Sequence, residues 1–225
     1  MEITGAVEGY LKVIYNLQHR PGSDAGPVAT SAVAARLGVA RPSVSAMLAR
    51  LEHDGLVRRH QPRGVTLTHA GTEAALRVVR RHRLLETLLF DRLGVPWDEV
   101  HEEAERLEHV VSERLEGYID RSLGYPTHDP HGDPIPRPDE PVETLAALAA
   151  APDGCRFSIR RVSDADPAVL RFLGEQGIRP GTTVTVVEHS PFDGPVWVAL
   201  ADRDARLPLP PALARAVYGV PVQSN

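Results

Sequence analysis

The sequence contains a single cysteine, Cys155, among its 225 residues. One thiol excludes an internal disulfide framework, and a lone cysteine is more often a packed or surface residue than a nucleophile. No stretch approaches the roughly 18 consecutive apolar residues of a membrane-spanning helix, and the N-terminus lacks the basic and then apolar layout of a signal peptide. These absences lead us to expect a cytoplasmic protein with no membrane partner.

The chain also lacks a uniform excess of positive charge, since its formal net charge is −5. The charge is nevertheless unevenly distributed along the sequence. Arginines dominate residues 36–83, whereas acidic residues dominate residues 98–120. A basic segment followed by an acidic one predicts DNA contact in the first and cation binding in the second.

The arginine-rich segment carries a helix-turn-helix pattern followed by a wing. Residues 31–38 and 42–55 predict two helices joined by a tight turn, and two β-prone runs around a polar tip follow them. In such a fold the second helix enters the major groove and the wing lies near phosphate. Each arginine alone could be a solvated surface charge, but together with the motif they favour DNA binding. The expected contacts are Arg41, Pro42, Ser43, Ser45, Ala46, Arg50 and Arg63.

Two long helices are predicted next, over residues 68–93 and 98–123. Their apolar faces exceed what one small winged helix can cover, which predicts a dimerisation region, and a symmetric dimer suits a palindromic operator. Donor side chains recur at i, i+4 on the first helix and at i, i+4, i+7 and i+8 on the second. These donors are His82, Glu86, His101, Glu105, Glu108 and His109.

This donor set has two interpretations. Imidazole and carboxylate groups without a thiolate suit Mn(II), Fe(II), Co(II), Ni(II) or Zn(II). The alternative is a solvated acidic face in which Glu105 pairs with His101 or His109 and no metal takes part. The number of donors on one stripe favours the metal site.

The C-terminal half begins with a proline-rich stretch, residues 125–152. Its His128, Asp129, His131 and Asp133 could form a metal site, but such a sequence more often serves as a structured connector. Four β-prone runs and one helix after Asp153 predict a small SH3-like barrel.

We therefore expect a mainly α chain with small β parts, divided into four segments. These are a winged helix-turn-helix DNA-binding domain (residues 1–71), a helical metal-binding and dimerisation domain (72–140), a linker (141–152), and an SH3-like domain of the FeoA type (153–225).

Motifs over nearly the whole chain resemble those of the diphtheria-toxin-repressor family of metal-dependent transcriptional regulators, most of all its actinobacterial manganese-responsive branch. The motifs are VEGYLKVIY, RPSVSAMLARLEHDGLV, VTLTHAG, RRHRLLETLL, VHEEAERLEHVVSERL and DPHGDPIP. The resemblance implies a repressor that binds palindromic operator DNA as a homodimer when Mn(II) is bound, and that controls manganese homeostasis.

The resemblance also implies two metal sites. His82, Glu86 and His101 match the ancillary site of the family, and Glu105, Glu108 and His109 match its primary site. At the position of Glu105, iron-responsive members carry a cysteine and manganese-responsive members a glutamate. A carboxylate is the harder ligand and suits Mn(II).

Three positions depart from the family pattern or leave it open. The family usually supplies a methionine or aspartate ligand where this chain has Gly9, and the adjacent Glu8 could substitute for it. Asp164 and Asp166 both match the stretch from which relatives lend a ligand to the ancillary site, and either could cap the next helix instead. We take Glu8 and Asp164 as additional candidate ligands. Ala46 stands where iron-responsive relatives place a glutamine, so the operator preference can differ.

Two rival functions follow from the same residues. One is an Fe(II)-dependent repressor of the same family, against which Glu105 argues; Co(II) and Zn(II) are further candidate effectors. The other is an enzyme, a metal-dependent hydrolase or oxygenase built on the histidine and carboxylate donors, which would leave the helix-turn-helix unexplained. That reading is disfavoured because no nucleophile or glycine-rich phosphate loop accompanies the donors. We expect operator DNA and a second copy of the chain as partners, and no small-molecule substrate.

Overall fold

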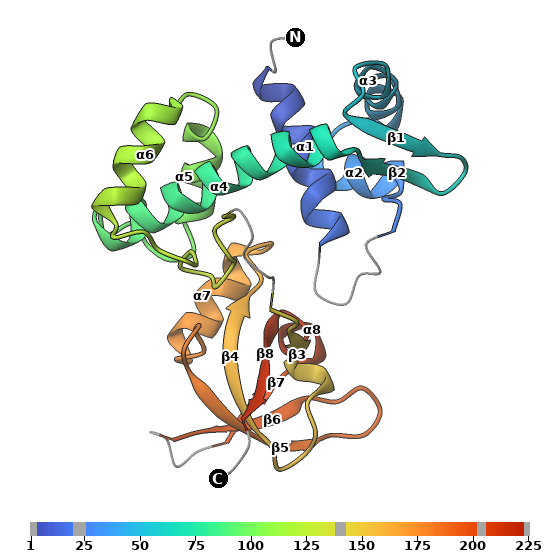
Figure 1. Cartoon of the computed structure of the whole chain (residues 1–225). Helices are drawn as coiled ribbons and strands as arrows, with labels where there is room; N and C mark the ends of the chain where they lie inside the picture. Colours follow the sequence, from blue (N-terminus) through green and yellow to red (C-terminus); the bar gives the residue numbers. More distant parts are fainter. Residues whose placement is uncertain (1–3, 20–25, 138–142, 202–205, 223–225) are drawn as a thin grey trace.

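The computed structural model describes residues 4–19, 26–137, 143–201 and 206–222. A long helix crosses the upper half of the molecule, with the N-terminal helices and a small wing at one end and two shorter helices at the other (Figure 1). A six-stranded antiparallel sheet forms the lower half. This arrangement confirms the mainly α fold with small β parts. Among the described residues, no helix combines the length and apolar character that crossing a membrane requires.

The N-terminal unit is a winged helix-turn-helix. Val44, Leu48 and Leu51 of α3 are buried in its core, while the opposite face of that helix is exposed, as its apolar spacing predicts. The wing is an antiparallel pair in which Val57 faces Leu67. The elements are α1 (Gly5–Gln18), α2 (Thr30–Leu37), α3 (Arg41–His53), β1 (Val57–His60) and β2 (Gly64–Leu67).

The long helix α4 (His69–Asp91) connects this unit to the rest of the molecule. Its N-terminus is capped by Thr68, whose hydroxyl accepts a hydrogen bond from the Gly71 amide (3.1 Å). Gly71 allows the helix to approach the preceding strand, because a Cβ there would lie 1.9 Å from the Leu56 carbonyl oxygen. α4 packs against α1 near its start and against α5 near its end.

The second predicted long helix is wrong, because the chain forms two helices there. α5 (Val100–Leu107) ends before Glu108, and α6 (Glu113–Ser122) begins after a turn. The Ser112 hydroxyl caps α6 by accepting a hydrogen bond from the Leu115 amide (3.3 Å). A side-chain cap of this kind favours a new helix start over continuation of the old helix.

The C-terminal sheet has the strand order β3-β8-β4-β5-β6-β7. Its first strand, β3 (Ala146–Ala147), lies inside the segment that we expected to be a linker. The following Leu148 is fully buried in the barrel core, and this burial draws the segment into the barrel. The other elements are η1 (Leu148–Ala150), β4 (Arg156–Val162), α7 (Pro167–Glu175), β5 (Thr183–His189), β6 (Val196–Leu200), β7 (Leu207–Leu209), α8 (Pro211–Ala214) and β8 (Val217–Val222).

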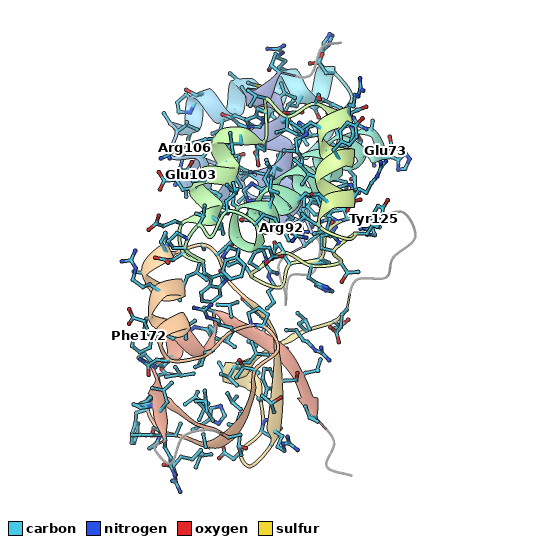
Figure 2. The ribbon with its side chains drawn as sticks, turned by 90° about the vertical axis from the view of Figure 1, so that its left-hand side faces the viewer. Glu73, Arg92, Glu103, Arg106, Tyr125 and Phe172 are labelled. Atoms are coloured by element: carbon cyan, nitrogen blue, oxygen red, sulfur yellow. The ribbon has the colours of Figure 1, made fainter. Side chains whose placement is uncertain are left out.

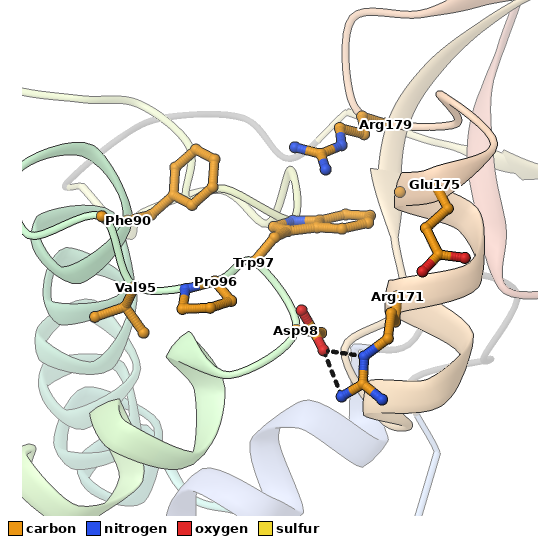
Figure 3. A pocket seen from close by; sticks show the side chains of 10 residues that line it. Phe90, Val95, Pro96, Trp97, Asp98, Arg171, Glu175 and Arg179 are labelled. Carbon is orange, nitrogen blue, oxygen red and sulfur yellow. Dashed lines mark hydrogen bonds and ion pairs between the residues drawn. The ribbon is translucent and has the colours of Figure 1, made fainter.

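Direct contacts join the barrel to the helical half. Asp98 accepts two hydrogen-bonding contacts at 2.7 Å from the guanidinium of Arg171 on α7. The Arg179 guanidinium lies 5.0 Å from the ring centre of Trp97, in a shallow cleft that Figure 3 shows from close by. Figure 2 shows Phe172 on α7 in the lower half of the molecule, below Arg106 and Glu103 in the helical half.

The proline-rich loop over residues 125–137 packs at the same junction. Asp129 organises its turn, because one carboxylate oxygen accepts hydrogen bonds from the amides of His131 and Asp133, both at 2.9 Å. Gly132 has a φ of +88°, and a Cβ there would lie 1.9 Å from the Arg160 carbonyl oxygen. Only glycine lets the turn lie this close to β4.

Candidate metal centre and DNA-binding face

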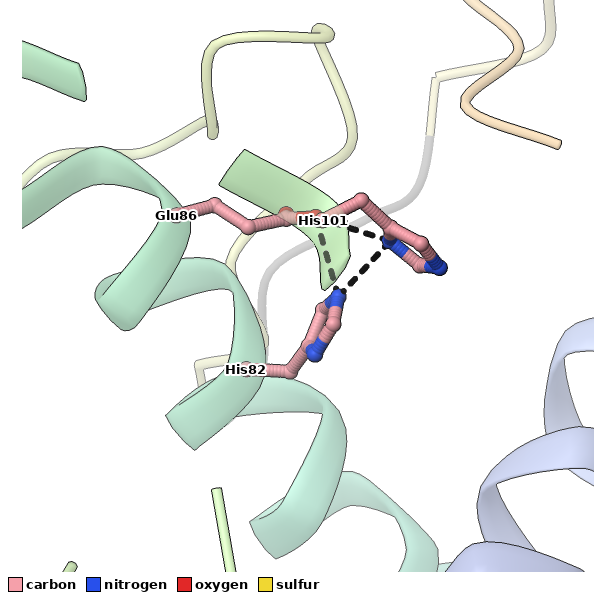
Figure 4. A group of neighbouring side chains, drawn as sticks. All are labelled: His82, Glu86 and His101. Carbon is pink, nitrogen blue, oxygen red and sulfur yellow. Dashed lines mark hydrogen bonds and ion pairs between the residues drawn. The ribbon is translucent and has the colours of Figure 1, made fainter. Parts of the chain in front are cut away.

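His82 and Glu86 of α4 meet His101 of α5 in a tight triangle (Figure 4). Glu86 Oε1 lies 2.9 Å from His82 Nε2 and 3.0 Å from His101 Nδ1, and the two ring nitrogens are 3.1 Å apart. The i, i+4 spacing on α4 and the antiparallel return of α5 bring these atoms together. Two imidazole nitrogens and a carboxylate oxygen thus converge on one point, as ligands of a metal ion do.

The barrel contributes a fourth group to this triangle. Asp164 Oδ2 lies 3.1 Å from His101 Nδ1. Asp166 instead caps α7, where its carboxylate accepts a hydrogen bond from the Ala168 amide (2.9 Å). The structure therefore separates the two aspartates that the sequence left equivalent, and it places only Asp164 at the donor cluster.

Burial and mutual pairing set the charges of this cluster. Burial alone would lower the pKa of His101, but its hydrogen bonds with Asp164 and Glu86 raise that pKa to about 10. Burial also opposes the charged form of His82, yet Glu86 raises the pKa of His82 above its ordinary value. Burial would raise the pKa of Glu86, while His82 and His101 hold it well below its usual range. In the metal-free cluster this pairing favours the protonated imidazoles and the ionised Glu86.

The second predicted donor group lies one turn away and faces α1. Glu108 is completely buried, and its Oε2 lies 2.6 Å from His82 Nδ1, which links the two groups. Glu105 stays on α5 and is half exposed, whereas Glu108 and His109 follow the end of that helix. The single-helix stripe expected from the i+7 and i+8 spacing is therefore wrong, although the turn still directs Glu108 toward Glu105.

Lys12 of α1 occupies the space between these carboxylates. Its Nζ lies 2.6 Å from Glu105 Oε1 and 2.6 and 2.8 Å from the two oxygens of Glu108, and Lys12 is only 4% exposed. Hydrogen bonding from His82 and the charge of Lys12 overcome the effect of burial and lower the pKa of Glu108. The pair of carboxylates is thus arranged around a cation, here an ammonium group. This is the arrangement that a divalent ion would also require.

The sequence reasoning missed Lys12. A lysine on an amphipathic helix is usually solvated, and its acidic partners lie more than ninety residues away in the chain. One signal was available, because Lys12 is the only lysine in the sequence, which otherwise uses arginine for its permanently charged basic groups.

At the N-terminal helix, Gly9 stands where the family pattern has a ligand, and the structure shows where the neighbouring Glu8 lies. Glu8 Oε2 lies 2.7 Å from His109 Nδ1, and Glu8 Oε1 lies 3.8 Å from the Arg81 guanidinium. Glu8 therefore reaches the second donor group, as its position beside Gly9 suggested. A Cβ at Gly9 would have open space around it, so no steric requirement for glycine is evident at that position.

The expected DNA-binding residues form an exposed face on α3 and the wing. All of them are exposed, and Val44 and Leu48 between them point into the core. Arg50 makes a long contact with Asp54 (3.7 Å), and its exposed guanidinium stays available to a partner. The exposed residues are Arg41, Pro42, Ser43, Ser45, Ala46, Arg50 and Arg63.

Comparison with known families matches three consecutive parts of the chain. Residues 2–65 match the N-terminal DNA-binding domain of iron-dependent repressors, residues 68–137 match the metal-binding and dimerisation domain of iron-dependent repressors, and residues 146–221 match the FeoA domain.

Whole-chain relatives give the same picture. The iron-dependent repressor IdeR of Mycobacterium tuberculosis is 34% identical over 221 residues, which cover 92% of this chain and 94% of that protein. A solved structure of a manganese-dependent transcriptional repressor in complex with manganese has a TM-score of 0.88 and 43% identity, with coverage of 96% of this chain and 99% of that one. The solved structure of the manganese regulator SloR has a TM-score of 0.78 and 30% identity, with coverage of 99% of this chain and 100% of that one.

Proposed function

Because the chain belongs to the diphtheria-toxin-repressor family of metal-dependent transcriptional repressors, we propose that Mn(II) is the ion that activates it. The family consists of transcriptional repressors, which sets the enzyme alternative aside. The observation that carries the choice of metal is the paired carboxylates of Glu105 and Glu108 around one cationic group. Two carboxylates with imidazole and no thiolate form a hard donor set that suits Mn(II).

In this proposal the two donor groups hold two ions. His82, Glu86 and His101 would ligate one ion, with Asp164 joining from the barrel. Glu105, Glu108 and His109 would ligate the other, with Glu8 reaching the group from α1. A bound metal would supply positive charge where Lys12 and the imidazolium protons supply it in the metal-free chain.

The coupling to DNA runs through α1. This helix packs against the core of the winged unit with Leu11 and Ile14, and it holds the second donor group with Lys12 and Glu8. Exchange of Lys12 for a metal ion at Glu105 and Glu108 would change how α1 is held, and with it the placement of α3. The ion would favour the conformation in which two α3 helices of a dimer fit successive major grooves of a palindromic operator, so operator DNA should tighten metal binding equally.

Fluorescence anisotropy with the full-length chain tests the proposal. The DNA is a labelled duplex with an inverted repeat, selected by the chain from a random library in the presence of Mn(II). We expect Mn(II) to strengthen binding by roughly 5- to 150-fold, the usual range of such couplings. Glu105→Ala should abolish this response. Glu102→Ala is the matched control, because Glu102 lies on the same helix and pairs with Arg106 at the exposed surface. DNA binding that ignores both Mn(II) and chelator rejects the proposal.

Fe(II) is the second candidate effector, because the curated relatives include iron-dependent repressors. Parallel titrations with Mn(II) and Fe(II) under anaerobic conditions separate the two ions. A Glu105→Cys chain adds a direct test of the donor argument, since a thiolate should shift the preference toward Fe(II). An unaltered chain that responds to Fe(II) at lower concentration than to Mn(II) would favour iron.

A further inference from the structure

The wing is a two-stranded hairpin, β1 and β2, which the rest of the DNA-binding unit has to hold in place. A hairpin of two strands is only marginally stable alone in water. In an antiparallel pair, every second amide points outward, away from the partner strand. The amides of Arg59 on β1 and of Val65 and Leu67 on β2 each donate to an acceptor outside the hairpin. These acceptors therefore fix where the wing lies.

The strand β2 is held from the side of α1. The Leu67 amide donates to Gln18 Oε1 (3.2 Å), and Gln18 is the last residue of α1 and is only 8% exposed. The Val65 amide and carbonyl both pair with the backbone of Val28, before α2 (2.9 and 2.8 Å). Gly64 permits this approach, because a Cβ there would lie 2.0 Å from the Val28 carbonyl oxygen. The end of β2 is thus tied to α1 by a hydrogen bond to a buried side chain.

The strand β1 is held from the side of α3. The Arg59 amide donates to Glu52 Oε1 (3.1 Å), and Glu52 lies in the last turn of α3. A carboxylate is unfavourable there for two reasons. The C-terminal end of a helix carries partial negative charge, and DNA phosphates approach the same unit. The basic neighbours Arg50 and His53 suit both the helix end and DNA. An acid that helix and ligand both disfavour indicates a separate task, and the structure shows its contact with the wing.

We propose that Gln18 and Glu52 are positioning residues that make the wing a hydrogen-bonded bridge between α1 and the recognition helix α3. This inference rests on the proposed function, since it takes α1 as the element that responds to Mn(II). Lys12 lies on the same helix, roughly 9 Å along the axis from Gln18. When the ion replaces Lys12 at the carboxylates, α1 shifts, and the bridge moves the wing and α3 together. Arg63 of the wing and the exposed face of α3 then reach DNA in a fixed relation.

The apolar core of the unit offers a second route from α1 to α3. Leu11 and Ile14 of α1 share this core with Leu48 and Leu51 of α3. Apolar burial is non-directional, so the core alone can carry α3 along without setting the angle of the wing. Hydrogen bonds are directional and set that angle relative to both helices. The bridge therefore predicts that loss of either hydrogen bond weakens the response to metal even though the core stays intact.

Fluorescence anisotropy with the full-length chain and the selected duplex tests the bridge. The quantity of interest is the coupling factor, the ratio of the DNA dissociation constants in chelator and in Mn(II). Gln18→Met keeps the length of the side chain and removes the acceptor. It should lower the coupling factor by roughly 2- to 30-fold, the range for residues that carry coupling, and leave Mn(II) binding without DNA unchanged. General loosening of the unit would instead weaken DNA binding equally in chelator and in Mn(II), which leaves the ratio unchanged.

A pair of variants at Glu52 separates the hydrogen bond from the charge. Glu52→Ala and Glu52→Gln both remove the negative charge, which should strengthen DNA binding in both alike, but only glutamine keeps an acceptor. The coupling factor should fall in Glu52→Ala and stay at that of the unaltered chain in Glu52→Gln. Glu73→Ala is the matched control, because Glu73 is an exposed acid near the start of α4 that pairs with His69. Its coupling factor should be unchanged.

Equal coupling factors in Glu52→Ala and Glu52→Gln overturn the proposal. Because Glu52 is exposed, this pair gives the answer even if Gln18→Met does not fold. A folded Gln18→Met chain with the coupling factor of the unaltered chain also overturns it. DNA binding by the unaltered chain that ignores Mn(II) rejects the proposed function itself. A normal Mn(II) response in the unaltered chain and in every variant rejects only this inference.

Discussion

Lys12 is the residue on which the metal-free state of the second donor group depends. An ammonium is a compact point charge with three donors, so it can contact two carboxylates from different sides, whereas a guanidinium is a wide plane. Glu108 is completely buried and would otherwise be an uncompensated charge. The sole lysine of the chain thus stands between two carboxylates that its compact ammonium contacts at once.

Replacing Lys12 by methionine should destabilise the metal-free chain. Removal of one partner from a buried ion pair typically costs about 3–5 kcal/mol, because the other charge stays buried. Urea unfolding in chelator measures this loss, and Mn(II) should recover more stability in Lys12→Met than in the unaltered chain. Equal stability of the two chains in chelator would contradict the ion-pair interpretation.

Amine acylation followed by mass spectrometry provides an independent readout of the same side chain. Lys12 is the only side-chain amine in the sequence, so the modified site is unambiguous. It should react slowly in chelator, where it is buried between carboxylates, and faster once Mn(II) is added. Arg81→Gln removes a contact of the same region but keeps Lys12 and both carboxylates. Its acylation rate in chelator tests whether general loosening of the region alone makes Lys12 react faster.

The pairing of His101 with Asp164 predicts a pH dependence of stability in the metal-free chain. The pKa of His101 is raised from its ordinary 6.5 to about 10, so its contribution is complete below pH 6.5 and is lost as the pH rises toward 10. The pKa of Asp164 is lowered from 3.8, so its contribution is present above that pH and is lost in stronger acid. Thermal unfolding of the unaltered chain and His101→Gln in chelator should therefore differ most between about pH 4 and 6.5 and converge toward pH 10. A difference that grows with pH would oppose this assignment.

At the scale of elements, the sequence predicted most helices and strands but not the break between α5 and α6. Periodicity identified α4 and α3 because their apolar positions recur regularly and their ends carry caps or glycine. The break at Glu108 escaped because the acidic run continues through it with helical spacing, and the Ser112 cap is a local signal that a long pattern hides. β3 escaped because two residues are too short for a pattern.

The donor cluster was likewise predictable only in part from the sequence. His82, Glu86 and His101 come from spacing on two helices, and the structure does bring their atoms together. Lys12 and His131 approach the cluster from distant parts of the chain, and only the tertiary fold reveals those contacts. The choice of Asp164 over Asp166 likewise depends on where α7 begins, because the cap uses the second aspartate.

For helix α3, we predict that Arg41→Ala weakens operator binding. Arg41 is the first residue of the helix and is exposed, so it can contact phosphate at the groove edge. Loss of one phosphate contact should reduce the slope of log affinity against log salt by about 1 and leave Mn(II) binding unchanged. Anisotropy titrations at several salt concentrations measure both. Arg215→Ala, an exposed arginine on the barrel, should leave the slope intact.

At the scale of the whole molecule, exposed apolar side chains near α5 and α6 lead us to predict that a second copy packs there. Val110 is 77% exposed, and Leu115 and Tyr118 are about half exposed on one face of α6. These residues fall within the part of the chain that matches the metal-binding and dimerisation domain. Isolated exposed leucines need no explanation, but several exposed apolar residues in one short segment favour an interface.

Leu115→Glu should therefore produce a monomer in sedimentation equilibrium and weaken operator binding strongly, because a monomer contacts only one half-site. Burying a charge at an apolar contact is the physical reason. Phe192→Ser is the control, since Phe192 is fully exposed on the barrel and lies outside the predicted interface. A Leu115→Glu chain that remains dimeric at micromolar concentration would place the interface elsewhere.

The lysine held between Glu105 and Glu108 competes with the activating metal ion for the same two carboxylates. A competitor attached to the same chain cannot be diluted, and a group on a short flexible arm acts at an effective concentration in the millimolar range. The free ion must therefore reach a concentration high enough to displace the Lys12 ammonium before it can bind Glu105 and Glu108. The threshold of the response is then set by the length and placement of one side chain, and shortening or removing it would recalibrate the sensor without altering a single ligand.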